Sequence, residues 1–237
     1  YAAILKEHFT KAVDLLSDIV FHSLYPQSEI NKEIEVICDE IESYNDSPAE
    51  LIYDLFENII FHGHPLGHNI LGDAWQLRTY NSETAKTFTQ RFYKPQNAVF
   101  FAYGDINFDN LVDLLKKRTK GFGVQKPIIG DADIVAPLPA YQPTTKCIEK
   151  GTHQTHVMIG NRAYSVHDER RIALYLLNNI IGGPSMNARL NLSLRERYGL
   201  VYTVESTMVS YSDTGVWCTY FGCDPHDVKR CLKKKKK

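Results

Sequence analysis

The sequence lacks the marks of a membrane protein, of a disulfide scaffold and of several enzyme classes. No apolar run approaches the roughly 20 residues that a membrane-spanning helix needs, and no signal peptide is visible at the beginning. The five cysteines are odd in number and never occur as C-x-x-C, which argues against a disulfide framework or a cysteine zinc site. We therefore expect free thiols in a reducing compartment. The motifs G-x-S-x-G and G-x-x-x-x-G-K-[ST] are also absent, so serine-hydrolase and P-loop functions have no support.

An excess of positive charge is missing too. The net charge is −1, and five of the 27 basic residues form the terminal run Lys233–Lys237. Without that run, 22 basic residues stand against 28 acidic ones, a balance of −6. We interpret the run as a solvated tail or as an artefact of where the chain ends. Because nucleic acids and anionic membranes attract basic surfaces, we expect neither as a partner.

The composition that remains is that of a folded protein. A hydrophobic fraction of 43% over 237 residues excludes a disordered chain and is enough for one large or two small domains. The first part has mainly helical periodicity, and Ala98–Tyr103 is predicted to be a buried strand. Ser47 and Ser82 are expected as helix N-caps. The predicted helices are Ala2–Ser23, Gln27–Tyr44, a helix from Pro48 through Ile59, Ser82–Phe92 and Phe108–Thr119.

A proline-rich break separates this part from a second one. Four of the ten prolines lie between Gly121 and Pro143, and we place a linker at 123–145, between domains at 1–122 and 146–237. The strands and helices do not alternate regularly, which indicates an α+β fold. The elements predicted in the second part are strands at His153–Gly160, Val201–Val209 and Gly215–Gly222, helices at Asp168–Ile181 and Ser185–Tyr198, and a polar turn at Ser212–Thr214.

Acidic residues on the second predicted helix form the first candidate site. Glu33 and Glu40 are seven residues apart, so they lie nearly one above the other on a helix. Both fall at the border of an isoleucine stripe, where a carboxylate can point into a cleft. Glu35 and Glu42 form a second pair farther round. Four acids on one helix are more often a solvated face, and helix geometry leaves both interpretations open.

Histidines form a second candidate cluster in His62–His68. An H-x-H pair with a third histidine nearby can bind a transition metal. The glycines and proline within this stretch favour a loop in which the histidines cap turns instead. His153 and His156 are three apart on a predicted strand, so they face opposite sides and cannot chelate one ion together.

Arg195 and Tyr202 form the third candidate site. The arginine lies near the end of a predicted helix and the tyrosine near the start of a predicted strand, with Gly199 between them. Both side chains donate hydrogen bonds suited to a carbonyl oxygen or a developing oxyanion. A solvated arginine and a half-buried strand tyrosine are the alternative.

Several stretches, in order, resemble one family, the pitrilysin/insulinase-like zinc metallopeptidases or inverzincins. Lys32–Ile41, followed by Asp46-Ser47-Pro48, resembles the helix that carries the third zinc ligand. His64–Gly72 is similar to the loop that follows in bacterial and processing-peptidase-type members. Leu194–Tyr202 resembles the family's arginine and tyrosine, seven residues apart, and Asn178–Pro184 fits the helix end before them.

The resemblance implies a role for each candidate residue. Glu40 would be a carboxylate ligand of Zn²⁺, and Glu33 an acid that supports the site. Arg195 and Tyr202 would bind the peptide backbone beside the scissile bond. The implied architecture is part of a tandem pair of duplicated α+β units, each an antiparallel-rich sheet with flanking helices. Residues 1–122 would be the C-terminal part of the first unit and residues 146–237 the N-terminal part of the second. The first unit would bind zinc and the second, inactive one would contact substrate. The resemblance also implies a peptide substrate, a homo- or heterodimer with a related subunit, and a bacterial cytoplasmic location.

One part of the family pattern is missing. The sequence contains no H-x-x-E-H, which in the family supplies two zinc ligands and the glutamate general base. We therefore expect this chain by itself to be inactive. The favoured interpretation is a chain that begins after that motif in a zinc metalloendopeptidase acting on peptides or unfolded polypeptides. The alternative is a non-catalytic subunit or scaffold of the same family that binds peptide or an active partner.

Overall fold

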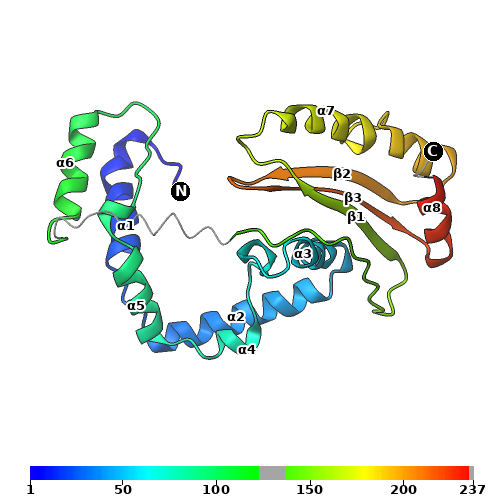
Figure 1. Ribbon diagram of the computed structural model, residues 1–237. Helices are drawn as coiled ribbons and strands as arrows, with labels where there is room; N and C mark the ends of the chain where they lie inside the picture. The colour runs from blue at the N-terminus through cyan, green and yellow to red at the C-terminus, as the bar shows by residue number, and fades with distance from the viewer. Residues whose placement is uncertain (123–136, 235–237) are drawn as a thin grey trace. The chain divides into compact units, whose positions relative to one another are not determined.

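The computed structural model describes residues 1–122 and 137–234 and divides into two compact units (Figure 1). The first unit contains Tyr1–Cys38 together with the described residues from Asp73 onward, up to residue 122. The second contains Asp39–Gly72 together with residues 137–234. Most of the linker predicted at 123–145 lies outside the described residues, and its described end, 137–145, is neither helix nor strand. The predicted domain boundaries stay a prediction.

The first unit consists of helices. Helices α1 and α6 pack together around the buried side chains of Val13 and Leu111. An ion pair of 2.7 Å between Asp14 and Arg118 joins the same two helices at the surface. The helices of this unit are α1 (Phe9–Phe21), the first part of α2 (Gln27–Asn45), α4 (Ala74–Leu77), α5 (Ser82–Phe92) and α6 (Phe108–Arg118).

The strand predicted at Ala98–Tyr103 is wrong. These residues have no regular secondary structure, and the side chains of Val99, Phe101 and Tyr103 are 97%, 83% and 94% exposed. A strand gains its hydrogen bonds and its buried face from neighbouring strands. The described residues of the first unit contain no strand that could pair with this segment. The apolar sequence of the segment therefore does not form a strand here.

One helix start and two predicted N-caps differ from prediction, whereas α3 (Pro48–Ile60) and α5 begin at the predicted residues Pro48 and Ser82. The first helix begins at Phe9 and not at Ala2, after a short 3-10 turn at Lys6–His8. Ser47 occupies the N-cap position of its helix, but its side chain makes no capping hydrogen bond. Helix α5 is capped by Asn81 and not by Ser82, because Asn81 and Thr84 satisfy each other's backbone N–H groups in a capping box.

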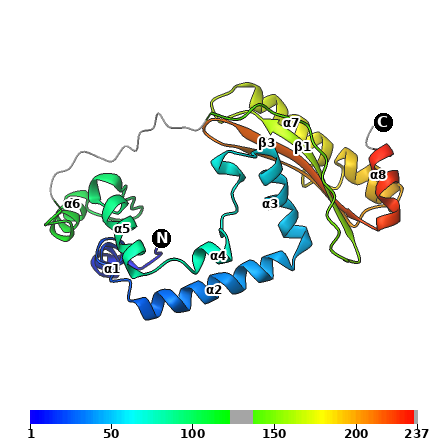
Figure 2. The same ribbon diagram turned by 60° about the horizontal axis from the view of Figure 1, so that its bottom comes forward.

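The second unit is built on a three-stranded antiparallel sheet with strand order β1-β3-β2, which confirms the α+β fold class. The predicted polar turn at Ser212–Thr214 joins β2 to β3. Helix α8 follows the end of β3 and includes Lys233 and Lys234 of the lysine run (Figure 2). The elements are α3 (Pro48–Ile60), β1 (Thr155–Ala163), α7 (Arg170–Gly182), β2 (Thr203–Ser210), β3 (Gly215–Cys223) and α8 (Val228–Lys234).

The helix predicted over Ser185–Tyr198 is only partly correct. Residues 185–188 form turns, and a π-helical segment covers Asn191–Arg197. The hydroxyl of Ser185 donates a hydrogen bond to the side chain of Asn187 at 2.6 Å. This side-chain contact lies within the turns that precede the helical segment.

The two faces of the sheet are covered by different helices (Figure 1). Helix α7 packs on β2, and α3 packs on β1. Successive side chains of β3 point to opposite faces, so Trp217 and Thr219 belong to the α7 face and Val216 to the α3 face. Within residues 1–122 and 137–234, no helix has the length and apolar character required to cross a bilayer.

Candidate functional site

Helix α2 presents both predicted acidic residues to solvent. Glu33 and Glu40 are exposed, while Ile34, Ile37 and Ile41 on the neighbouring stripe are half-buried. The carboxylates of Glu33 and Glu40 make no hydrogen bond or ion pair with any described residue. Both are therefore available to a ligand from outside the described part of the chain.

A catalytic zinc requires three protein ligands and an open position, and Glu40 fits the role of one carboxylate ligand. Among residues 1–122 and 137–234, no group of three metal-binding side chains includes Glu40. The described residues therefore do not form a catalytic zinc site around Glu40 by themselves.

The histidine-rich loop is used for structure, as its glycines and proline indicate. His64 is buried, and its Nδ1 accepts a hydrogen bond of 3.2 Å from the backbone N–H of Leu66. This bond caps the short 3-10 turn Pro65–Gly67. His62 and His68 are exposed. The turn-capping interpretation is confirmed for His64.

His156 also has a structural environment. Its Nδ1 lies 2.8 Å from the hydroxyl oxygen of Tyr220 on β3, and the two rings stack. Burial lowers the pKa of the His156 imidazole, because the charged form loses hydration. His153 precedes β1 and is not part of the strand. Neither histidine belongs to a metal-binding group of three among the described residues.

Helix α3 is attached to the sheet by two tyrosine–carboxylate hydrogen bonds, which we call the α3 interface. The hydroxyl of Tyr53 on α3 donates to Glu205 Oε1 on β2 at 2.5 Å. In the second bond the donor lies on the sheet side: the hydroxyl of Tyr211, next to β2, donates to Glu57 Oε1 on α3 at 3.2 Å. Arg162 on β1 also donates to the carbonyl oxygen of Ile60 at the end of α3, at 3.1 and 3.0 Å. The segment just after Glu40 is thus bound to the sheet of the second unit.

Burial shifts the pKa values of two side chains at the α3 interface, Glu57 and Tyr211. Loss of hydration raises the pKa of Glu57, and the hydrogen bond from Tyr211 only partly offsets this effect. Burial, followed by the nearby charge of Glu57, raises the pKa of Tyr211 to about 12. The two tyrosine–carboxylate contacts have no local signal in the sequence, because each joins residues more than 150 positions apart.

The arginine–tyrosine segment is held by backbone geometry. Gly199 has φ of +55°, a conformation that glycine adopts without strain, and it turns the chain between the π-helical segment and β2. The next two residues, Leu200 and Val201, are buried in the core. The backbone N–H of Tyr202 then donates to the carbonyl oxygen of Gly222 at 2.9 Å.

The side chains of this pair have separate partners. The Tyr202 hydroxyl donates to Asp224 Oδ1 at 3.2 Å, and the residue as a whole is 57% exposed. Arg195 is exposed, with its Nε 3.8 Å from Glu196 Oε1. The roles predicted for Arg195 and Tyr202 toward a peptide, like those of Glu33 and Glu40 toward zinc, stay predictions.

Asp224 also belongs to the one group of three metal-binding side chains found among the described residues, with His226 and Asp227. Asp227 Oδ1 accepts a hydrogen bond of 2.5 Å from Arg230, and Asp227 Oδ2 lies 3.5 Å from His226 Nε2. The guanidinium already supplies positive charge to this group. The group is therefore a polar cluster in which Arg230 offsets the charge of one of the two carboxylates.

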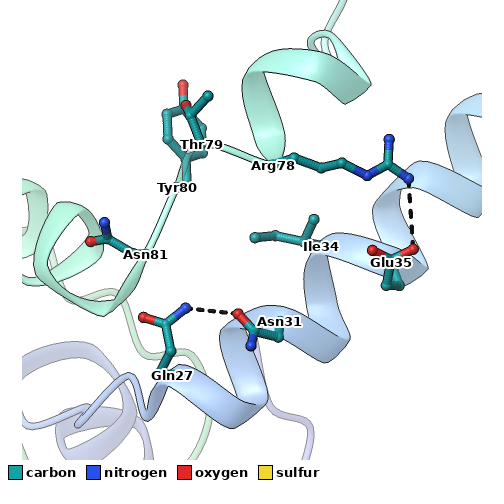
Figure 3. Close-up of a pocket in the computed structure, with 8 residues that line it drawn as sticks. All are labelled: Gln27, Asn31, Ile34, Glu35, Arg78, Thr79, Tyr80 and Asn81. Carbon is teal, nitrogen blue, oxygen red and sulfur yellow. Dashed lines mark hydrogen bonds and ion pairs between the residues drawn. The ribbon is translucent and has the colours of Figure 1, made fainter.

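The first unit has an open groove of about 580 Å³ between α2 and the segment that joins α4 to α5 (Figure 3). Arg78 and Glu35 approach across one end of it, with Arg78 Nη2 3.7 Å from Glu35 Oε2. Glu35, from the second acidic pair, is thus engaged, in contrast to Glu33 and Glu40. The lining residues are Gln27, Asn31, Ile34, Glu35, Arg78, Thr79, Tyr80 and Asn81.

Two family models match the chain in sequence order. Residues 1–74 match the model described as insulinase (peptidase family M16), and residues 79–234 match the model of the peptidase M16 inactive domain. The second match alone covers more than half of the chain. The two matches confirm the resemblance found in the sequence.

Curated relatives agree with the family models. An uncharacterized zinc protease of Bacillus subtilis is 31% identical over 236 residues, which are 97% of this chain and 54% of the relative. An uncharacterized zinc protease of Rickettsia felis is also 31% identical, over 100% of this chain and 56% of its own length. The chain thus spans about half the length of these curated relatives.

The structural comparison shows the same fold. A crystal structure of a peptidase M16 inactive domain from Pseudomonas fluorescens superimposes with a TM-score of 0.79 and 19% identity, over 97% of this chain and 55% of that one. The chain therefore belongs to the M16 family of insulinase-like peptidases.

Proposed function

We propose that this chain is part of a zinc-dependent metalloendopeptidase that hydrolyses peptides or unfolded polypeptides. The observation that carries the proposal is the ordered match to both M16 family models, together with relatives named zinc proteases at 31% identity. The relatives are about twice as long as the matched region. This length is compatible with further zinc ligands and a general base outside the described residues.

Each candidate residue has a distinct role in the proposal. Glu40 supplies one carboxylate ligand to the metal, and its exposed, unpaired carboxylate on α2 suits that role. Glu33, two turns earlier on the same helix, supports the site through its negative charge. Arg195 and Tyr202 bind the backbone of the peptide. When bound, the zinc would activate a water molecule for attack on the scissile carbonyl.

A pair of glutamine variants in the full-length protein tests the proposal. Glu40→Gln is expected to remove bound zinc and to lower peptidase activity by more than about 100-fold. Loss of a residue that only orients a metal ligand costs up to about 100-fold, and loss of the ligand itself should cost more. Glu42→Gln is the matched control, since Glu42 is also exposed and lies two residues further along the same helix. Zinc is measured by elemental analysis and activity with an unfolded protein substrate. Equal zinc content in both variants would contradict the role of Glu40.

The chain 1–237 taken alone gives a second test. We expect it to show no peptidase activity that a chelator abolishes, because its described residues hold no group of three ligands around Glu40. Chelator-sensitive cleavage by this purified chain would refute the assignment of the remaining ligands to other segments.

A non-catalytic subunit or scaffold of the same family is the second candidate. It is favoured by the larger family match, which is to the inactive domain. In that case the full-length protein would bind an extended peptide or an active partner, yet hold no zinc.

We also propose that either form acts in the cytoplasm, where its five free cysteines stay reduced, and assembles as a homo- or heterodimer. Sedimentation of the full-length protein, with and without a related subunit, tests the assembly.

A further inference from the structure

A single arginine of β1, Arg162, holds the C-terminal end of α3. Its Nε and Nη2 donate to the carbonyl oxygen of Ile60 at 3.1 and 3.0 Å, and its Nη1 donates to the carbonyl oxygen of Pro139. Its Cζ atom also lies 5.9 and 5.7 Å from the ring centres of Phe61 and Tyr141. Three segments that are distant in sequence, α3, residues 139–141 and β1, therefore meet at this guanidinium.

This contact suits the end of a helix and is partly shielded from water. The last carbonyl groups of a helix lack helical partners and carry partial negative charge, so a cation that donates to them satisfies both. Ile60 and Phe61 are buried, and they form a cluster with Val216 of β3 against which Leu138 packs. Because water competes less for a shielded bond, we expect this contact to hold α3 firmly.

A rigid helix keeps its direction only when it is held at more than one point. The hydrogen bonds of Tyr53 and Glu57 hold the central turns of α3, and Arg162 holds its end. Helix α3 has 13 residues and is therefore about 20 Å long. Without Arg162, α3 can turn about its central turns, and its N-terminal end then moves as well.

The N-terminal end of α3 is joined to α2 by a short corner with little freedom. Helix α2 ends at Asn45 and α3 begins at Pro48. The backbone N–H groups of Asp46 and Ser47 both donate to carbonyl oxygens of α2, at 3.0 and 3.1 Å. The carbonyl oxygen of Ser47 in turn accepts from two N–H groups of α3, at 3.1 and 2.9 Å. A movement of α3 is therefore passed to the last turns of α2.

Tyr44 extends this link toward Glu40. The two residues are four positions apart on α2, so their side chains lie on the same side of the helix. The Tyr44 hydroxyl donates to the carbonyl oxygen of Glu50 on α3 at 3.3 Å. Burial, and then the nearby negative charge of Asp54 on α3, raise the pKa of Tyr44, so that carboxylate also lies close. Glu40 and these residues all belong to the second unit, whereas Glu33 belongs to the first.

We propose that Arg162 is a positioning residue for Glu40. By fixing α3 on the sheet, it sets where the Glu40 carboxylate stands relative to the other ligands of the metal. The inference rests on the proposed function, in which Glu40 binds zinc, and it gives the sheet of the second unit a part in metal binding. Helix α3 lies in the region that matches the insulinase model, and Arg162 lies in the region that matches the inactive-domain model. The inactive domain thus contributes to the site without supplying a ligand.

The first experiment tests the link without any metal. Hydrogen exchange of the metal-free, full-length protein is measured by mass spectrometry for the wild type and for Arg162→Met, which keeps an apolar stem but has no donor. We expect faster exchange in α3 and in residues 39–47, because the end of α2 follows α3. Exchange in residues 27–38 of α2 and in β3 is expected to stay unchanged. Faster exchange confined to the last turn of α3 overturns the proposal.

The second experiment measures the Kd of the full-length protein for zinc by competition with a zinc-binding dye. Arg162→Met is expected to raise this Kd about tenfold, the lower end of the range for residues that orient a metal ligand. Arg197→Met, at an exposed arginine of the π-helical segment, is the matched control and should leave the Kd unchanged. Asn178→Leu breaks the buried network on the α7 face and should also leave it unchanged. An equal rise in Asn178→Leu would show that the Kd follows general stability, and it overturns the proposal.

Two more variants examine how Arg162 acts. Arg162→Lys can still donate to the Ile60 carbonyl oxygen, so its Kd should lie between those of the wild type and Arg162→Met. The double variant Glu40→Gln/Arg162→Met should bind zinc no more weakly than Glu40→Gln alone, measured at raised zinc concentration, because Arg162 acts only through Glu40. Additive losses overturn the positioning role. If the wild type binds no zinc, the proposed function fails, and the exchange measurement still decides whether Arg162 fixes the segment around Glu40.

Discussion

The two faces of the sheet are held by different kinds of contact. On the α7 face, Asn178 is only 5% exposed, and its Oδ1 accepts hydrogen bonds from Ser206 Oγ at 2.7 Å and Trp217 Nε1 at 3.0 Å. Gly182 lies so close that an added Cβ would be 2.8 Å from the Cβ of Ser206. On the α3 face, the Tyr53–Glu205 and Glu57–Tyr211 bonds remain partly open to solvent.

This difference indicates different functions for the two contacts. A buried, fully bonded amide network with close backbone approach makes α7 an integral part of the sheet's core. A partly solvated pair of tyrosine–carboxylate bonds adds less stability for each bond, because water competes for the same groups. The α3 interface is therefore the weaker of the two, and it is the contact that connects the segment after Glu40 to the sheet.

The largest effect is expected at Asn178. Asn178→Leu leaves the indole N–H of Trp217 and the hydroxyl of Ser206 without this buried partner, and we expect a loss of about 3 kcal/mol in the free energy of unfolding. Asn179→Leu makes the same chemical change at the next, exposed residue and is expected to cost less than about 1 kcal/mol. Chemical denaturation of the full-length protein measures both. Equal losses would show that the buried network is not what holds α7.

A smaller effect is expected at the α3 interface. Tyr53→Phe removes the hydrogen bond to Glu205 but keeps the ring, which contacts Tyr220, and we expect a cost of about 1 kcal/mol. Hydrogen exchange should show faster exchange of the α3 amides with unchanged protection in β3. Tyr175→Phe is the control, because Tyr175 is an exposed residue of α7. Loss of protection in α3 and β3 together would contradict a separable α3 interface.

The smallest effect is a pH dependence of stability that comes from Glu57 at the α3 interface. The pKa of Glu57 is raised above its ordinary 4.5 by burial, so the folded state binds more protons than the unfolded state. The stability from this group is fully present below about pH 4.5 and is lost as pH rises through the raised pKa. Glu57→Gln should remove this part of the pH dependence of unfolding.

His156 provides the reference for that measurement, because its pKa shift has the opposite sign. Burial lowers the pKa of His156, so its contribution is present above its ordinary pKa of 6.5 and is lost as pH falls through the lowered value. The difference between the wild type and Glu57→Gln, measured from pH 4 to 7, isolates the carboxylate. A difference that grows in favour of the wild type toward higher pH would contradict the burial of Glu57.

The local elements were largely predictable from the sequence. Helix α2 begins at the predicted residue and ends one residue later, the β2–β3 turn is at the predicted place, and His64 caps a turn as its neighbours indicate. The strand predicted at Ala98–Tyr103 was wrong because a strand depends on a neighbouring strand and not only on its own apolar pattern.

The sequence by itself determined the α+β class, because the periods of helices and strands are local properties. The resemblance of its motifs to the family pointed to the family and to the candidate residues Glu33, Glu40, Arg195 and Tyr202. Only the tertiary structure decided that Tyr53 meets Glu205 and that Tyr202 meets Asp224. These pairs are separated by 152 and 22 positions, and their contacts exist only once the strands have paired and α3 has packed on the sheet. Periodicity tells which face of an element is apolar, whereas partner choice follows from the packing of whole elements.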